Sequence, residues 1–191
     1  MHRLARKLNY MLILASASPR RHELLLAAGI GHVVRPAHVP EVRRNGERPE
    51  DFVQRLAKEK AESLPLSPGD TILGADTIVC LEGEVLGKPA DAAGAIRMLR
   101  GLAGRDHRVL TGICLRRGDR TVVDFAETRV WFDALTENEI QEYVHSGEPM
   151  DKAGAYAIQG RASRFTTRID GCYHNVVGLP VSLVYHYLKT V

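Results

Sequence analysis

The sequence is poor in cysteine and has no long hydrophobic run. Its 191 residues include three cysteines, Cys80, Cys114 and Cys172, which lie far apart and form no CxxC pair. Neither a disulfide framework nor a zinc site is therefore predicted. Charged residues or glycine interrupt every apolar stretch before it reaches the roughly 20 residues that a membrane-spanning helix needs. We therefore expect a protein of the cytoplasm without a membrane partner.

Aromatic residues and excess charge are also scarce. Aromatic side chains make up 6% of the chain, and Arg3, Arg6 and Lys7 account for the formal net charge of +3. Proteins that bind nucleic acids normally have clustered cations or aromatic stacking platforms, so this composition argues against such a partner. The first residues are too polar for a secretory signal. We expect residues 1–10 to be a disordered basic extension and residues 11–191 to form one domain.

Short apolar runs alternate with segments of helical periodicity along the domain. Strands are predicted at 11–15, 32–35, 71–81, 85–86, 107–115 and 121–132, with further strand-like pieces up to Val177. Helices are predicted at 19–29, 49–64, 91–103 and 136–144 and after Pro180. Gly118 and Asp119 mark a hairpin between two long strands. This order predicts an α/β or α+β fold, with helices flanking a mixed sheet.

The first predicted helix has a clear start. Ser18 suits its N-cap and Pro19 its first position, and we expect Leu24, Leu25 and Ala28 to form its buried face.

The segment SASPRR, Ser16–Arg21, joins the first strand to this helix. A helix N-terminus offers unpaired N–H groups and the positive end of the helix dipole, which attract phosphate. Arg20 and Arg21 add fixed charges, and a guanidinium can hold phosphate oxygens in a bidentate fashion. The same residues also suit an ordinary capped helix whose arginines face water.

Asp76 lies within the apolar run LGADTIVCL. A carboxylate in such a strand costs several kcal/mol unless it is paired or binds a cation. Metal binding or base catalysis would supply that compensation. A structural aspartate that accepts backbone N–H groups or pairs with a buried arginine is the alternative.

Three other charged residues are candidates for the same site. Lys60 falls within the apolar face of the second predicted helix, where it either reaches a phosphate or Asp76 or extends along the helix to water. Lys88, in LGKP, follows the strand that carries Asp76. Glu41 is a candidate acidic ligand in an aperiodic loop, where a solvated glutamate is the plainer interpretation.

The segment DKAGAYAIQG, Asp151–Gly160, combines small residues with Gln159. A glutamine amide can read a base edge through its donor and its acceptor, whereas a tight turn explains the glycines equally well. The histidines show no metal-ligand spacing, which disfavours a histidine-bound zinc.

Seven blocks together resemble the Maf family in content and order: LASASPRRHELL, RLAKEKA, GADTIV, GEVLGKP, RMLRGLAGRDHRVLTG, GEPMDKAGAYAIQG and NVVGLP. The resemblance runs from about Met11 to the C-terminus. It implies a Maf/ITPase-like fold with a long mixed sheet and a cleft between two lobes, often in a homodimer. It also implies hydrolysis of the α–β phosphoanhydride of a nucleoside triphosphate, with Mg²⁺ or Mn²⁺ as cofactor.

The family pattern assigns roles to individual positions. It implies that Asp76 is the general base and, with Glu41, a metal ligand. The positions that match its phosphate-binding groups are Ser16, Arg21, Lys60 and Lys88. This sequence departs from the pattern at Pro40, where the family usually has an acidic residue before the glutamate.

Three positions distinguish the branches of the family. Arg20, Thr77 and Gln159 match the branch that hydrolyses dTTP and UTP. The branch acting on 7-methyl-GTP typically has an aromatic residue, Gln and Glu there, and a carboxylate suits a cationic purine. We therefore expect a pyrimidine nucleotide pyrophosphatase. The alternatives are a 7-methyl-GTP pyrophosphatase, a non-catalytic nucleotide-binding regulator of cell division, and a nucleic-acid-binding protein that uses the basic extension.

Overall fold

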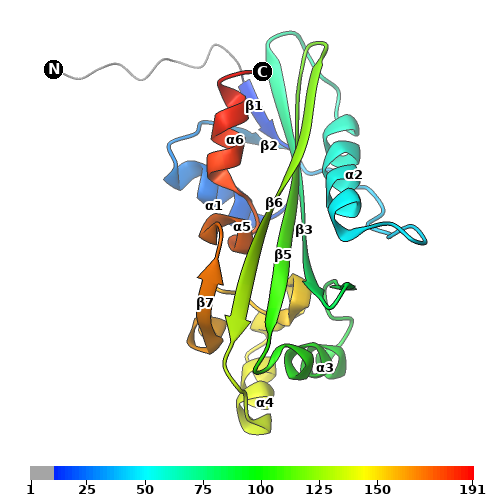
Figure 1. Cartoon of the computed structure of the whole chain (residues 1–191). Helices are drawn as coiled ribbons and strands as arrows, with labels where there is room; N and C mark the ends of the chain where they lie inside the picture. Colours follow the sequence, from blue (N-terminus) through cyan, green and yellow to red (C-terminus); the bar gives the residue numbers. More distant parts are fainter. Residues whose placement is uncertain (1–10) are drawn as a thin grey trace, which may run out of the picture.

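A seven-stranded mixed sheet forms the centre of the protein. The computed structural model describes residues 11–191 (Figure 1), so the prediction for residues 1–10 lies outside the described part. The strand order is β2-β1-β3-β5-β6-β7, with β4 paired to β3. The strands are β1 (Met11–Leu14), β2 (Val33–Val34), β3 (Asp70–Leu81), β4 (Glu84–Leu86), β5 (Asp106–Arg117), β6 (Arg120–Phe132) and β7 (Thr166–Asp170). β1 runs parallel to β2 and β3, and the other pairs are antiparallel, which confirms the predicted mixed sheet.

Helices cover both faces of this sheet. They are α1 (Pro19–Ala27), α2 (Pro49–Glu62), α3 (Ala92–Leu102), α4 (Glu137–His145), α5 (Tyr173–Val177) and α6 (Val181–Leu188), with 3-10 helices η1 (Glu148–Asp151), η2 (Ala153–Ala155) and η3 (Arg161–Phe165). Figure 1 shows α2 on one face, α1, α5 and α6 on the other, and α3 and α4 at the far end of the long strands. None of the helices within residues 11–191 has the length and apolarity to cross a membrane.

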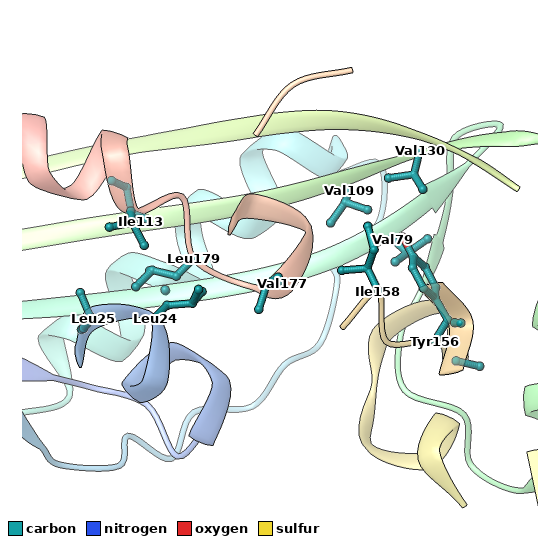
Figure 2. Packing of buried hydrophobic residues seen from close by; sticks show 14 of the residues in the cluster. Leu24, Leu25, Val79, Val109, Ile113, Val130, Tyr156, Ile158, Val177 and Leu179 are labelled. Carbon is teal, nitrogen blue, oxygen red and sulfur yellow. The ribbon is translucent and has the colours of Figure 1, made fainter. Parts of the chain in front are cut away.

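Successive side chains of β3 point to opposite faces of the sheet, so the hydrophobic core has one part on each face. Leu73, Ala75 and Val79 join the main cluster with residues of α1, α6 and the 156–158 segment, as Figure 2 shows for part of it. Ile72 and Ile78 point to the opposite face and pack against α2. Since successive strand residues face opposite ways, Asp76 lies on the α2 face and Thr77 on the main-core face.

Two glycines allow α2 to lie unusually close to the sheet. A Cβ atom added at Gly74 would be 2.1 Å from the carbonyl oxygen of Ala57, and one added at Gly112 would be 2.2 Å from that of Val53. Gly112 is also the cross-strand partner of Asp76. The helix backbone therefore rests directly on the strands beside Asp76.

Two predictions about local structure are wrong. Ala28 is exposed, as are the last two residues of α1, because only Leu24 and Leu25 of the last two turns face the core before the chain turns at Gly29. The segment Tyr173–Val177 is a helix rather than a strand-like piece, and its Asn175 side-chain amide donates to the Val109 carbonyl at 2.9 Å and to Thr128 Oγ1 at 3.0 Å. Tertiary contacts with β5 and β6 thus override the β preference of the local sequence.

Candidate active site

A cleft of about 630 Å³ opens midway along the long strands. Its walls come from the start of α1, the 37–43 loop, α2, β3, and the segments that precede and follow η2. All nine residues singled out from the sequence line it: Ser16, Arg20, Arg21, Glu41, Lys60, Asp76, Thr77, Lys88 and Gln159. Segments far apart in the chain therefore bring these side chains to one cavity.

Lys60 joins two carboxylates at the base of the cleft. Its Nζ donates to Asp76 Oδ1 at 2.6 Å and to Glu41 Oε1 at 2.6 Å. Asp76 is 5% exposed and Lys60 7%, whereas half of the Glu41 side chain is exposed. The close approach of α2 to β3 places Lys60 over Asp76, so neither buried charge is unpaired.

Burial raises and neighbouring cations lower the pKa of both acids, and a different effect dominates at each. Burial raises the pKa of Asp76 above its usual range and outweighs the nearby Lys60 and Arg21. Burial also pulls the pKa of Glu41 upward, but its hydrogen bond to Lys60 and the surrounding cations outweigh this effect, so that pKa is lowered. Asp76 is thus easier to protonate than an ordinary aspartate, and Glu41 is harder to protonate than an ordinary glutamate.

Arg21 is a buried junction between three parts of the chain. Its Nε donates to the Gly178 carbonyl, its Nη1 to Ser16 Oγ and to the Ala75 carbonyl, and its Nη2 to Thr77 Oγ1, at 2.8 to 3.0 Å. These bonds use four of the five guanidinium N–H groups. A bidentate grip on phosphate would therefore require one of them to break.

Ser16, rather than Ser18, organises the start of α1. Ser18 occupies the N-cap position and Pro19 follows it as predicted, but the Ser18 side chain makes no capping hydrogen bond. The Ser16 hydroxyl instead accepts the Ser18 backbone N–H at 3.2 Å. No capping side chain therefore covers the first N–H groups of α1 at the cleft.

A chain of hydroxyl groups that the sequence did not reveal lies behind Arg21. Thr77 Oγ1 lies 2.9 Å from Thr111 Oγ1, and Thr111 donates to the backbone carbonyl of Asn175 at 3.2 Å. Because the guanidinium can only donate, Thr77 accepts from Arg21 and turns its own proton toward Thr111 or Gly178. The NVVGLP segment is thereby tied to the site.

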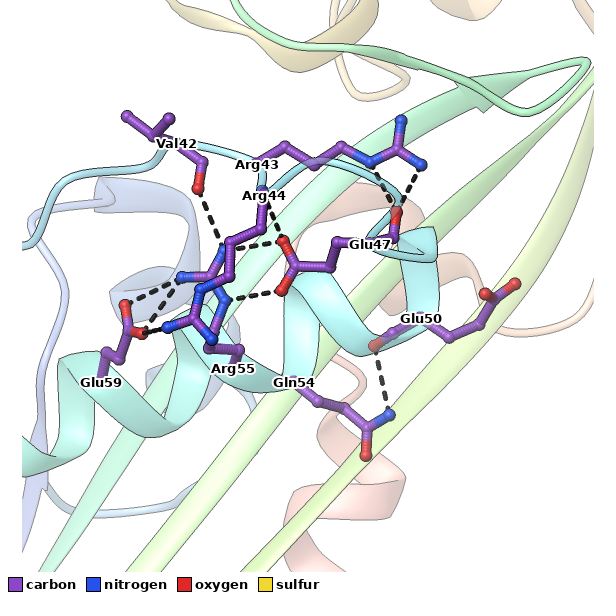
Figure 3. Close-up of polar contacts among 8 residues, drawn as sticks. All are labelled: Val42, Arg43, Arg44, Glu47, Glu50, Gln54, Arg55 and Glu59. Carbon is purple, nitrogen blue, oxygen red and sulfur yellow. Dashed lines mark hydrogen bonds and ion pairs between the residues drawn. The ribbon is translucent and has the colours of Figure 1, made fainter.

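A second unforeseen group fastens the loop that carries Glu41 to α2. Arg55 donates to both carboxylate oxygens of Glu47 at 2.6 and 2.8 Å and to the Val42 carbonyl at 3.0 Å, as Figure 3 shows. Glu47 also accepts the backbone N–H of Arg44 at 2.9 Å. The hydrogen bonds from Arg55 lower the pKa of Glu47 to about 2. This group holds the residue next to Glu41 in place.

Two of the three residues predicted to set selectivity, Arg20 and Gln159, lie at the rim. Arg20 pairs with Asp151 at 3.3 Å, and Gln159 is exposed. Lys88, also exposed, is near enough to contribute to the lowered pKa of Glu41. The Thr77 hydroxyl, in contrast, is engaged with Arg21 and Thr111.

The two acids suit a cation that is shared with a ligand. Each directs one oxygen to Lys60, which leaves Asp76 Oδ2 and Glu41 Oε2 for another partner. Within residues 11–191 no cluster of three or more His, Cys, Asp or Glu side chains could hold a metal ion. Since Mg²⁺ is commonly bound by one or two carboxylates together with substrate phosphates, this pair fits such an ion.

Comparisons with known proteins find similar sequences and a similar fold over nearly the whole chain. A dTTP/UTP pyrophosphatase of Koribacter versatilis is 52% identical over 179 residues, covering 93% of each chain. One of Symbiobacterium thermophilum is 54% identical over 171 residues, covering 89% of this chain and 88% of its own. The structure of the Staphylococcus aureus Ham1 protein has a TM-score of 0.51 at 16% identity, covering 94% of this chain and 98% of its own, a likeness of fold. Residues 11–191 match the family described as Maf-like protein, and the chain belongs to that family.

Proposed function

We propose that this protein hydrolyses dTTP and UTP to the nucleoside monophosphate and pyrophosphate. The observation that carries the proposal is the buried Asp76 carboxylate, held by Lys60 in a cleft lined by further cations. The pyrophosphatase names of relatives about half identical over nearly the whole chain support the same reaction. We place the reaction in the cytoplasm, because the cysteines at positions 80, 114 and 172 are free.

Asp76 acts as the general base in this proposal. Lys60 occupies its Oδ1, which leaves the two lone pairs of Oδ2, one to face the cation and the other to accept a proton from water. A raised pKa makes the carboxylate a better base. The water oxygen forms a bond to the α-phosphorus, the bond from that phosphorus to the bridging oxygen breaks, and pyrophosphate leaves with the bonding electrons.

Cations and helix N–H groups would stabilise the charge on the phosphates. Lys60 and Lys88 flank the cleft, and the N-terminus of α1 opens into it. Such groups favour charge that develops on phosphoryl oxygens. Arg21, with four N–H groups engaged, would shape this pocket and offer one donor.

Asp76 and Glu41 would hold a divalent cation together with the substrate. Mg²⁺ or Mn²⁺, when bound, would neutralise phosphate charge and polarise the phosphoryl oxygens. We assign base recognition to Gln159, whose amide matches the donor and acceptor edge of uracil or thymine, together with Arg20 and Thr77, which line the same cleft. A homodimer, as the family resemblance implies, belongs to the same proposal.

The test is pyrophosphate release from a panel of nucleoside triphosphates, with Mg²⁺ or Mn²⁺ and with chelator. We expect dTTP and UTP to be preferred, and Asp76→Asn to lose most turnover while keeping its fold. Asp70→Asn, on the same strand outside the cleft, is the matched control. Wild-type rates in Asp76→Asn would exclude the base assignment, and tight nucleotide binding without turnover would favour a regulator. Preference for 7-methyl-GTP would exclude the pyrimidine assignment.

A further inference from the structure

Hydrogen bonds to the Glu148 carboxylate hold the loop that carries Gln159. The Glu148 carboxylate accepts the backbone N–H of Arg161 at 3.0 and 3.2 Å and the hydroxyl of Tyr143 at 2.8 Å. That hydroxyl in turn accepts the backbone N–H of Ala157 at 3.1 Å. Backbone groups two residues before and two residues after Gln159 are thus fixed by one carboxylate and one phenol.

The surroundings of Glu148 fit this contact closely. A Cβ atom added at Gly160 would lie 2.2 Å from Glu148 Oε1, so only glycine leaves room for the carboxylate beneath the loop. Tyr143 is fully buried. The Lys152 ammonium donates to the Glu148 backbone carbonyl at 3.0 Å. The half-buried Glu148 is therefore held both at its backbone carbonyl, by Lys152, and at its carboxylate, by the hydroxyl of a buried tyrosine.

Glu148 acts at a distance from the reacting groups. It does not line the cleft, whereas Gln159 does. Asp76 and Lys60 stand on β3 and α2 and share no hydrogen bond with it. Loss of Glu148 should therefore loosen the 157–161 loop without disturbing the base or the phosphate-binding cations.

We infer that Glu148, through Tyr143, is a positioning residue that sets the affinity for the nucleobase by fixing the Gln159 loop. The inference rests on the proposed function. A loop already in its bound conformation does not have to be ordered when the ligand binds, which improves affinity. Because the phosphate contacts are separate, the effect should be confined to ligands that carry a base.

The experiment measures KM and kcat for dTTP and the inhibition constant of inorganic triphosphate, which has no base. In Glu148→Ala we expect KM to rise about tenfold, as for a lost hydrogen bond to a charged group, with kcat and the triphosphate constant within about twofold of wild type. Glu148→Gln keeps Oε1 as acceptor, so it should recover much of the affinity. Tyr143→Phe keeps the ring and should raise KM as well. Glu142→Ala, an exposed glutamate of α4, is the matched control.

The outcomes separate this inference from the proposed function. Equal losses for dTTP and inorganic triphosphate in Glu148→Ala, or an unchanged KM in both Glu148→Ala and Tyr143→Phe, would overturn the positioning role. If Gln159→Ala raises KM while the Glu148 variants do not, the positioning role alone is wrong. If Gln159→Ala leaves KM unchanged, base recognition by Gln159 is wrong and the inference is overturned with it.

Discussion

Replacement of Lys60 by methionine tests how the buried charges of the cleft depend on one another. Methionine keeps most of the side-chain length and removes the ammonium that lies 2.6 Å from both Asp76 and Glu41. Removing one partner of a buried ion pair typically costs about 3 to 5 kcal/mol, because the other charge remains buried and unpaired. We expect about 3 kcal/mol here, since Glu41 is half-exposed and Arg21 still acts on Asp76.

Urea and thermal unfolding measure this loss. For a chain of this size, a loss of about 3 kcal/mol should lower the Tm by about 6 to 12 °C. Lys58→Met, on the exposed face of the same helix with a 3.8 Å pair to Glu62, should change the free energy of unfolding by less than about 1 kcal/mol. The double variant with Asp76→Asn removes both buried charges and should recover most of the stability.

The same substitution has a defined effect on pH dependence. Burial already raises the pKa of Asp76, and Lys60 opposes it. Without the ammonium that pKa rises further, so the carboxylate is protonated at higher pH and the acid limb of kcat/KM moves upward. An unchanged acid limb together with unchanged stability in Lys60→Met would refute the coupling between the two residues.

Two further predictions concern residues that the sequence did not single out. Thr111→Val should lose about 1 to 3 kcal/mol of stability and lower kcat/KM, because a buried hydroxyl partner of Thr77 is lost. Thr111→Ser keeps the hydroxyl and should keep activity. Equal activity in both variants would contradict the role of this chain of hydroxyl groups in supporting Arg21. Glu47→Gln should lower the free energy of unfolding by about 2 kcal/mol at neutral pH. Because folding lowers the pKa of Glu47 from 4.5 to about 2, the extra stability of the wild type is present above about pH 4.5 and disappears as the pH falls through 2. Acid unfolding measures this dependence. A stability difference between wild type and Glu47→Gln that persists at pH 2 would show that the charge is not its source.

Local patterns predicted most of the fold. Periodicity placed the long strands and the helices, and the helix predicted from residue 136 begins with a capping box formed by Thr136 and Glu139. The hairpin turns at Gly118, between β5 and β6. The α5 segment was misjudged because its conformation depends on contacts of Asn175 with strands more than 40 residues away in sequence. Such contacts leave no periodic signal.

The site was predictable where a charged residue lies in an otherwise apolar segment. Asp76 in an apolar strand and Lys60 on an apolar helix face both required a partner, and each is the other's. Arg55 and Thr111 gave no such signal, because an arginine on a polar helix face and a threonine in a strand are common. Their importance follows from partners in the 42–47 loop and β3, which only the folded chain brings together.

The position of bond cleavage tests the central claim most directly. Hydrolysis of dTTP in H₂¹⁸O, followed by mass spectrometry of both products, reports which phosphorus the water attacks. Attack at the α-phosphorus predicts one ¹⁸O atom in the thymidine monophosphate, none in the pyrophosphate, and loss of both products in Asp76→Asn. Label in the pyrophosphate, or release of orthophosphate, would contradict the proposed reaction.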